Sequence, residues 1–348
     1  MTAPLPARGP LPDDVRIGLW GAPGSGKTTY LASLNVAVNR WHGPGNWIMN
    51  GVTDESSEFL THSTNLLTRQ HMFHNATSDP QNVIFRFTGT EAPPPVRRGV
   101  FGRAKPVAPQ RVAFELDVLD VPGWYYRSNG HPVEQQLDDE FSIAGAPGGQ
   151  RVTSLTDTED QLLDHLEMCG GIIYLFDPVR DARTGDAFDF FHRMLEKLAR
   201  RIFEQERYQG TYLPQHLAVC VTKFDDPEIY KAARRYGLTV QSEHPPHLPL
   251  VPDGYADEFF QRLCHESPNG TADLVRGALA NHFDPQRLRV FVTSAIGFYV
   301  GDGRRFRPND YANIKRGDDG QDRIRGGVFP INVLEPLLWI HSRLRNAR

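Results

Sequence analysis

The sequence predicts a single α/β domain in which six strands alternate with helices. Six short runs of apolar and β-branched residues are separated by segments whose apolar residues recur every three or four positions, which is typical of a parallel sheet covered by helices. The first run leads at once into a glycine-rich loop and then a helix. No internal repeat divides the chain, so we expect one domain over residues 15–348 after a flexible, proline-rich leader at 1–14.

The composition argues against several classes of protein. A formal charge of −4 over 348 residues gives no basic excess that would indicate nucleic-acid binding as the main activity. The cysteines Cys169, Cys220 and Cys264 are far apart and show no paired spacing, which disfavours a disulfide framework or zinc site and favours the reducing cytoplasm. No run approaches 18 consecutive apolar residues, so we expect no transmembrane segment.

The N-terminal half is expected to contain three strands and two helices. The first helix shows its period clearly, because Leu31, Leu34 and Val38 share one face. In chain order the elements are strand Val15–Trp20, helix Thr28–Arg40, helix Asp54–Gln70, strand Val83–Phe87 and strand Arg111–Leu119. Residues 92–110 contain consecutive prolines and several basic side chains, which predicts an exposed insertion; the alternative is a surface for a partner or lipid headgroups.

The C-terminal half continues the alternation after a long loop. Residues 124–154 have few periodic apolar positions and several glycines and prolines, which predicts a second insertion. The elements that follow are helix Leu155–Met168, strand Gly171–Phe176, helix Ala187–Gln205, strand His216–Thr222, helix Asp226–Tyr236, helix Thr271–His282, strand Arg287–Val292 and a C-terminal helix at about Pro330–Arg345. Residues 237–270 are rich in proline and histidine without a clean period, which predicts a third insertion on the surface.

The segment Gly-Ala-Pro-Gly-Ser-Gly-Lys-Thr at residues 21–28 is typical of a phosphate-binding loop. A glycine-rich turn at a helix N-terminus lets backbone N–H groups wrap a phosphate, although Pro23 has no N–H to contribute. Lys27 is expected to neutralise the β- and γ-phosphate oxygens, and the Thr28 hydroxyl to bind Mg²⁺. The expected nucleotide contacts here are Gly21, Gly24, Ser25, Gly26, Lys27, Thr28 and Thr29.

A second motif, Asp120-Val-Pro-Gly123, closes the third predicted strand. A carboxylate at a strand end is suited to hold a magnesium-bound water, and Gly123 can offer its N–H to the γ-phosphate. The alternative is a simple turn at the end of a strand. Because Asp120 follows a β-rich run directly, we favour the metal-binding role for Asp120 and a catalytic role for Gly123.

The tetrapeptide Thr222-Lys-Phe-Asp225 follows the fifth predicted strand and bears on the choice of base. A carboxylate accepts two hydrogen bonds from the N1–H and N2–H₂ edge of guanine, whereas adenine presents an acceptor at N1. Lys223 is expected to lay its aliphatic stem over the purine. Asp225 has an alternative role as the N-cap of the next helix. Ser294 and Ala295, after the last strand, are expected to contact the guanine oxygen through the backbone.

Taken together, these four motifs resemble the P-loop GTPases of the class that contains translation factors and Ras-like proteins. The segments Gly-Ala-Pro-Gly-Ser-Gly-Lys-Thr-Thr-Tyr-Leu, Phe-Asp-Pro and Thr-Lys-Phe-Asp are also similar to bacterial GTPases of the double-GTPase type, which belong to signalling or conflict systems. The resemblance implies a three-layer P-loop NTPase fold, with a mostly parallel six-stranded sheet and one antiparallel edge strand. It also implies GTP/GDP and Mg²⁺ as ligands, a molecular-switch function, and a protein partner or activating protein. A homo-oligomer is left open.

The family also uses a mobile threonine that binds Mg²⁺ when the γ-phosphate is present. Thr77, just before the strand Val83–Phe87, is at the expected place for this metal-binding and catalytic role. Thr53, Thr61 and Thr64 are the competing candidates.

The residue after Gly123 departs from the family pattern. Many members keep a water-orienting glutamine there, but this chain has Trp124, whose indole cannot orient water in the same way. We therefore expect slow intrinsic hydrolysis, with a catalytic group supplied by another loop, a protomer or a partner; Arg127 and His131 are the nearest polar candidates. The alternatives are a GTP-binding scaffold with little hydrolysis and a P-loop ATPase or nucleoside kinase.

Overall fold

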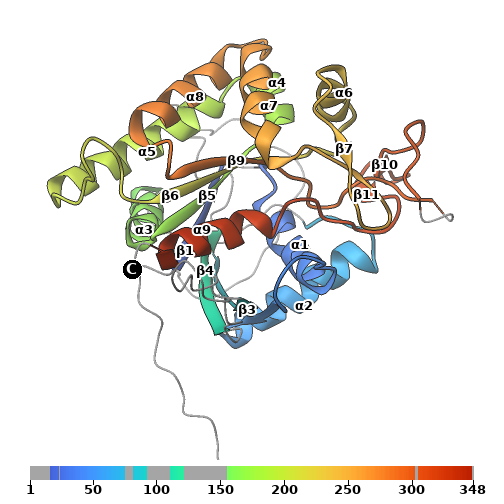
Figure 1. Ribbon diagram of the computed structural model, residues 1–348, viewed down its shortest axis with the longest axis horizontal. Coiled ribbons are helices and arrows are strands. Elements are labelled where there is room, and N and C mark those ends of the chain that lie inside the picture. Colours follow the sequence, from blue (N-terminus) through green and yellow to red (C-terminus); the bar gives the residue numbers. More distant parts are fainter. Residues whose placement is uncertain are drawn as a thin grey trace, which may run out of the picture.

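The computed structural model describes residues 16–22, 24–74, 81–91, 110–120, 155–301 and 305–346. The described chain is an α/β structure with a central sheet and helices on both of its faces (Figure 1). The predicted leader at 1–14, the insertion at 124–154 and all of 92–110 except Gln110 lie outside the described residues.

Within the described residues, seven strands form the central sheet. They are β1 (Arg16–Gly21), β2 (Ile48–Gly51), β3 (Gln81–Glu91), β4 (Gln110–Asp120), β5 (Gly171–Phe176), β6 (His216–Val221) and β9 (Leu288–Val292). Their order across the sheet is β2-β3-β4-β1-β5-β6-β9. The pairings among β4, β1, β5, β6 and β9 are parallel, so the carboxyl ends of these strands meet at one edge.

The expectation of six strands with one antiparallel edge strand was wrong in two respects. The sheet has a seventh strand, β2, and this strand occupies the edge, so that the antiparallel strand β3 is second from the edge. The four residues of β2 are too few to show a period, and they form a strand because they pair with β3 from Ile48 opposite Thr88 to Gly51 opposite Phe85. Long-range pairing, rather than local sequence, therefore creates this element.

The helices divide between the two faces of the sheet. On one face lie α1 (Lys27–Asn39), α2 (Asp54–Thr68) and α9 (Glu335–Asn346); on the other lie α3 (Leu155–Met168), α5 (Ala187–Glu204), α7 (Asp253–His265) and α8 (Thr271–His282). Alternate residues of β5 serve the two layers, since Tyr174 and Phe176 are buried with α5 and α7 whereas Ile173 and Leu175 are buried with α1 and α9. Two further helices, α4 (Pro178–Thr184) and α6 (Pro227–Arg235), follow β5 and β6.

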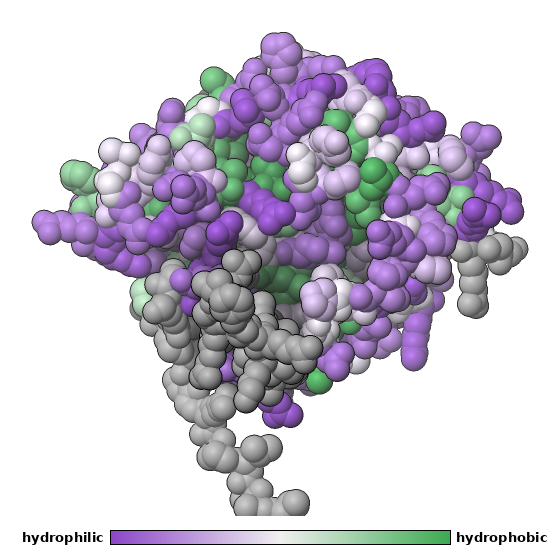
Figure 2. Space-filling model, in the orientation of Figure 1, coloured by the Kyte–Doolittle hydropathy of each residue, from purple (hydrophilic) through white to green (hydrophobic). Residues whose placement is uncertain are grey.

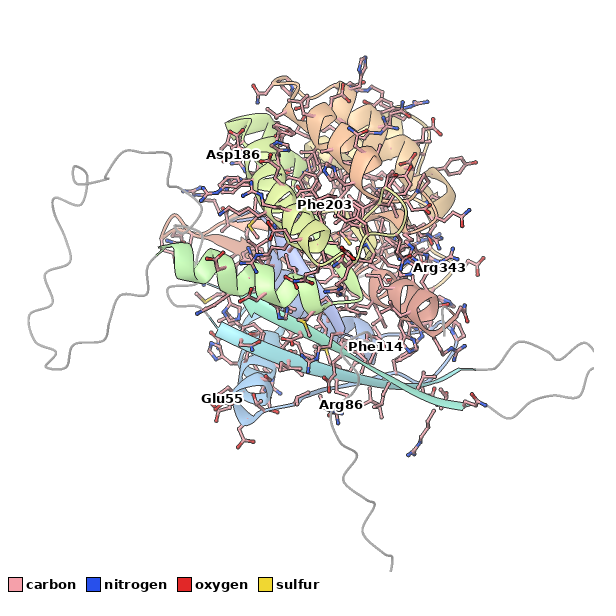
Figure 3. All side chains as sticks on the ribbon, turned by 90° about the vertical axis from the view of Figure 1, so that its left-hand side faces the viewer. Glu55, Arg86, Phe114, Asp186, Phe203 and Arg343 are labelled. Atoms are coloured by element: carbon pink, nitrogen blue, oxygen red, sulfur yellow. The ribbon has the colours of Figure 1, made fainter. Side chains whose placement is uncertain are left out.

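The β3–β4 hairpin shows how the same alternation separates an apolar face from a charged one (Figure 3). Phe87 and Phe114 stack with their ring centroids 4.9 Å apart and are fully buried. On the opposite face, the Arg86 guanidinium donates to the Glu115 carboxylate, with Nε 2.9 Å from Oε1. The predicted strands Val83–Phe87 and Arg111–Leu119 are shorter than β3 and β4, because the eleven paired positions extend through polar residues that no apolar pattern reveals.

Several predicted helices are confirmed, and two segments differ. The helices at 155–168 and 271–282 have the predicted bounds, but the C-terminal helix begins at Glu335 rather than near Pro330. Residues before it are held in another conformation, because the backbone of Ile331 exchanges two hydrogen bonds with Ser294. A helix cannot form where these backbone groups are already used.

The segment 237–270 is not only a surface insertion. It contains α7, which contacts β9 and buries Ala256, Phe259, Phe260 and Cys264 in the core. The spacing of those residues is helical, but the proline- and histidine-rich flank obscured it. Two small hairpins also escaped prediction: β7 (Val240–Gln241) with β8 (Pro249–Leu250), and β10 (Ile314–Arg316) with β11 (Asp322–Ile324).

The visible surface is mostly hydrophilic (Figure 2). The large apolar side chains that are exposed come from separate elements, for example Ile48 in β2, Phe203 in α5 and Leu274 in α8. In the part of the chain that the structure describes, no helix combines the length and apolar character needed to span a membrane.

Candidate nucleotide site at the carboxyl edge of the sheet

The glycine-rich loop joins β1 directly to α1, as expected. Gly24 and Gly26 have left-handed backbone conformations, with φ of 71° and 93°, and Gly26 is the N-cap of α1. At Gly21, a Cβ would lie 2.7 Å from the Ser25 hydroxyl and 3.0 Å from Leu175. Gly24 and Gly26 are therefore required by their backbone conformations, and Gly21 because there is no space for a side chain.

Two polar side chains of this loop, Lys27 and Ser25, are buried. Lys27 is largely buried, and its Nζ donates to the carbonyl oxygens of Gly21 at 3.1 Å and Ala22 at 3.4 Å. The Ser25 hydroxyl is buried, and within the described chain it has no hydrogen-bond partner. An ammonium, an unsatisfied hydroxyl and a helix N-terminus in one turn fit an anion such as a phosphate group.

The proposed metal ligands are only partly described. Thr28 is the second residue of α1 and is half-buried. Asp120 is the last residue of β4, which runs parallel to β1 with Gly18 opposite Asp117, so the backbone of Asp120 lies at the same sheet edge as the glycine-rich loop. Mg²⁺ binding by Thr28 and Asp120 stays a prediction from the sequence, based on the preference of Mg²⁺ for oxygen ligands.

The remaining predicted catalytic residues, Thr77 and Gly123, lie outside the described residues, as do Trp124, Arg127 and His131. The structure does inform the alternatives to Thr77. Thr53 caps α2 by accepting from the Ser56 N–H at 3.1 Å, and the Thr64 hydroxyl accepts from the Asn35 side chain at 3.1 Å. Thr61 is exposed on α2. Thr53 and Thr64 thus have structural partners of their own.

The segment after β6 is hydrogen-bonded to the carboxyl end of β5 and to the residue that follows β9. The Thr222 hydroxyl donates to the carbonyl of Phe176 at the end of β5, and the Phe224 N–H donates to the carbonyl of Thr293 after β9. Lys223 has a left-handed backbone, with φ of 59°, and its Nζ lies 2.6 Å from the buried Asp177 carboxylate. These contacts hold the predicted base-recognition residues at the carboxyl edge of the sheet.

Asp225 is a buried carboxylate at this edge, with only 6% of the residue exposed. The Ser294 hydroxyl donates to its Oδ1, yet burial raises the pKa of Asp225 to about 6. The alternative role as a helix cap was wrong, because Asp226 is the N-cap of α6 and accepts from the Glu228 N–H at 2.9 Å. The Asp225 carboxylate is therefore not used by the helix cap.

Ser294 is fixed from several directions, which explains how it can orient Asp225. Its hydroxyl also accepts from the Gly297 N–H at 2.8 Å, and its backbone pairs with Ile331. Ala295 follows it and is half-buried. The structure therefore brings the Asp225 and Ser294 side chains into contact, which the sequence did not predict. The backbone contact of Ser294 and Ala295 with a guanine oxygen stays a prediction.

One residue near this edge, Asp177, was not among the predicted site residues. Asp177 directly follows β5 and caps α4, where its Oδ1 accepts from the N–H groups of Val179 at 3.1 Å and Arg180 at 3.0 Å. The same carboxylate forms the ion pair with Lys223. The pair Asp-Pro after a strand is a helix-start signal that could have identified α4.

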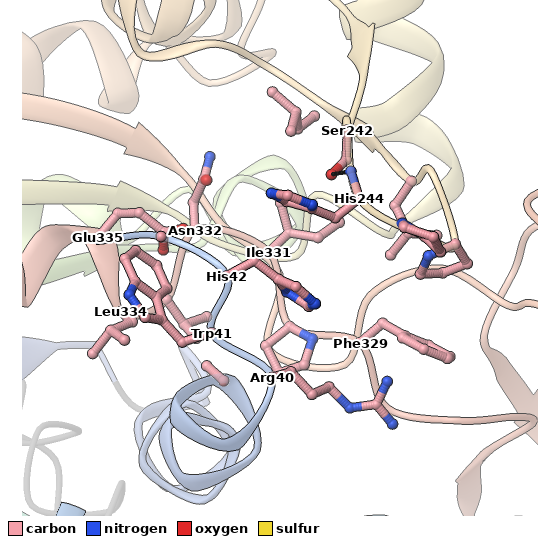
Figure 4. Close-up of a pocket in the computed structure, with 18 of the residues that line it drawn as sticks. Arg40, Trp41, His42, Ser242, His244, Phe329, Ile331, Asn332, Leu334 and Glu335 are labelled. Carbon is pink, nitrogen blue, oxygen red and sulfur yellow. Dashed lines mark hydrogen bonds between the residues drawn. The ribbon is translucent and has the colours of Figure 1, made fainter. Parts of the chain in front are cut away.

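A separate cavity of about 350 Å³ lies near the other end of α1 (Figure 4). It is lined by the last turn of α1 and by segments near 242–250 and 329–335. His42 and His244 stack there with ring centroids 4.6 Å apart, and burial raises the pKa of Glu335 to about 7. None of the predicted nucleotide contacts lines this cavity, and α1 separates it from the glycine-rich loop by roughly 20 Å.

In the described part of the chain, no group of three or more histidine, cysteine, aspartate or glutamate side chains is arranged to hold a metal ion. No protein-family model matches the chain, and no curated protein matches it either.

Proposed function

We propose that this protein binds GTP with Mg²⁺ and hydrolyses it to GDP and phosphate as a molecular switch. The observation that carries the proposal is the buried Asp225 carboxylate, which contacts Ser294 and is not used as the helix cap. It lies at the same sheet edge as a glycine-rich loop with a buried lysine.

At the phosphate end, the backbone N–H groups of Gly24 to Thr29 would surround the phosphates, and Lys27 would exchange its carbonyl contacts for phosphate oxygens. Thr28 and Asp120 would hold Mg²⁺, which supplies positive charge to the phosphate oxygens. Thr77 and the Gly123 N–H would contact the metal and the γ-phosphate, respectively. Their release after hydrolysis is the proposed switch.

At the base end, Asp225 would accept hydrogen bonds from N1–H and N2–H₂ of guanine. Adenine offers an N1 acceptor instead, which would leave the buried carboxylate unpaired and is therefore rejected. Lys223, held by Asp177, would cover the purine, while the backbone at Ser294 and Ala295 would contact the guanine oxygen.

The substitution Asp225→Asn tests the guanine assignment. The amide oxygen can still accept from N1–H, but the amide NH₂ repels the N2–H₂ donor of guanine and instead donates to the C2 carbonyl of xanthine. The affinity for GTP should therefore fall by roughly 100-fold or more while xanthosine triphosphate gains affinity. Both affinities are measured by titration with fluorescent nucleotides, and ATP is tested as a competitor.

The matched control is Asp226→Asn, because asparagine caps a helix as well as aspartate does and this carboxylate faces α6 rather than the pocket. It should leave GTP binding unchanged. Equal competition by ATP, or no gain for the xanthine nucleotide in Asp225→Asn, would contradict the proposal.

The proposal places the protein in the cytoplasm with a protein partner that responds to the bound nucleotide. Trp124 in place of a water-orienting glutamine is the reason to include a partner. Single-turnover hydrolysis, measured with and without candidate partners, distinguishes a switch from a GTP-binding scaffold: a rate equal to that in buffer under all conditions favours the scaffold.

A further inference from the structure

Arg180 lies beside the glycine-rich loop although it is remote from it in sequence. It sits on α4, which begins directly after β5, and β5 is the neighbour of β1 in the sheet. A Cβ built on Gly24 would be 3.8 Å from Nη1 of Arg180. The guanidinium is therefore at the rim of the turn that would hold the phosphates.

The orientation of the guanidinium is held by its neighbours. Asp186 binds it through two oxygens, with Nε 3.1 Å from Oδ1 and Nη2 in contact with Oδ2. The ring of Phe190 lies 5.1 Å from the guanidinium carbon. Because Nε and Nη2 face Asp186, the planar group presents its Nη1 side to Gly24.

The short helix that carries Arg180 is itself anchored. Asp181 is 1% exposed, and its carboxylate accepts from the hydroxyls of Ser267 at 2.9 Å and Thr271 at 2.8 Å. Asp177 caps the start of the helix, and a left-handed Gly185 ends it. A cation on such a support needs little reorganisation to act on a bound phosphate.

We propose that Arg180 stabilises the charge that develops on the phosphate groups while GTP is cleaved. This inference rests on the proposed GTP site. In the reaction, a water oxygen forms a bond to the γ-phosphorus, the bond to the β–γ bridging oxygen breaks, and its electron pair stays on GDP. One water proton leaves with the phosphate or to solvent. Arg180 donates N–H groups to the bridging oxygen and the γ-oxygens, where negative charge increases, while Asp186 keeps its plane fixed.

An arginine in this chain changes what a partner must supply. Because Trp124 cannot orient water as a glutamine does, a partner would still supply the water-orienting group, but the positive charge would already be present in the protein. An arginine in this role accelerates phosphoryl transfer by about 10³- to 10⁵-fold in comparable enzymes.

The test compares Arg180→Ala and Arg180→Lys with Arg183→Ala, a control on the exposed side of the same helix. We expect the single-turnover rate of preloaded GTP to fall at least about 100-fold in Arg180→Ala, whereas the dissociation constants for GTP and GDP change less than about fivefold. Arg180→Lys should recover little, because an ammonium lacks the planar fork, and Arg183→Ala should match the wild type.

A second readout does not depend on turnover. GDP with aluminium fluoride mimics the transferring phosphoryl group, so the wild type should retain GDP in its presence and Arg180→Ala should not. Unchanged circular dichroism and thermal midpoint show that the variant is folded. A wild type that binds no GTP refutes the proposed function itself.

Other outcomes overturn the inference and leave the GTP site intact. One is GTP hydrolysis and aluminium fluoride trapping by Arg180→Ala at wild-type levels. Another is an equal loss of GTP and GDP affinity, which would make Arg180 a binding residue only. If the wild type hydrolyses too slowly to measure, the trapping experiment decides, and failure of the wild type to trap GDP counts against the inference.

Discussion

The phosphate end and the base end of the proposed site are built in different ways. The phosphate end is one continuous turn, in which Gly24 and Gly26 have left-handed backbones and Lys27 donates to carbonyls of the same turn. The base end combines side chains from separate strand ends, with Asp225 after β6 held by Ser294 after β9. The phosphate end of the proposed site thus depends on local conformation, whereas base choice would depend on how β6 and β9 are arranged.

Lys27→Ala should have the largest effect and should not depend on the base. In the proposed site Lys27 would face the phosphates, and loss of such a buried cation costs about 2–5 kcal/mol. GTP, GDP and xanthosine triphosphate (the last tested in the Asp225→Asn background) should therefore each bind roughly 30- to 5,000-fold more weakly. Isothermal titration with each nucleotide measures this loss. Lys231→Ala, on the exposed surface of α6, is the control. A loss of affinity for only one of the nucleotide bases would contradict the view that the phosphate end acts independently of the base.

The base end should add a pH-dependent term to stability that the phosphate end lacks. Because burial raises the pKa of Asp225 from 3.8 to about 6, the folded protein binds a proton more tightly than the unfolded chain does. The stabilisation by this proton is complete below about pH 3.8 and is lost as the pH rises through 6, and it amounts to at most about 3 kcal/mol.

Urea unfolding of the nucleotide-free protein between pH 4.5 and 7.5 measures this term. Asp225→Asn carries no titrating group at this position. Its free energy of unfolding should therefore rise relative to that of the wild type as the pH rises toward 7. Parallel curves for the two proteins would mean that Asp225 titrates as an ordinary aspartate.

The smallest predicted effects concern two glycines with opposite roles. Gly26→Ala places a side chain at φ of 93° and should cost about 1–2 kcal/mol of stability, in addition to weakening nucleotide binding. Gly277→Ala in the interior of α8, where a Cβ meets nothing within 4 Å, should stabilise by about 0.5–1 kcal/mol. Thermal unfolding of both variants measures the contrast, and equal shifts would show that conformation does not distinguish these positions.

Much of the fold was predictable because its central strands and helices show strong periods. The strand at 171–176 and the helices at 155–168 and 271–282 have the predicted bounds, and each buries a regular set of apolar residues. Strand β2 and the hairpin β10–β11 were missed because their residues have no such pattern and depend on partners elsewhere in the chain. Helix α7 was missed although Phe259, Phe260 and Cys264 carried a usable signal.

The sequence by itself determined the strand–loop–helix unit at residues 16–39, since glycine placement, a helix start and apolar spacing all act over a few neighbouring residues. It also indicated which carboxylates and cations are candidates for ligand binding. Only the tertiary structure decided that Asp226 rather than Asp225 caps α6, that Ser294 contacts Asp225, and that Arg180 lies beside Gly24. The reason is physical: these contacts join residues far apart in the chain, and strand order and helix anchoring bring them together, whereas local propensity carries no information about either.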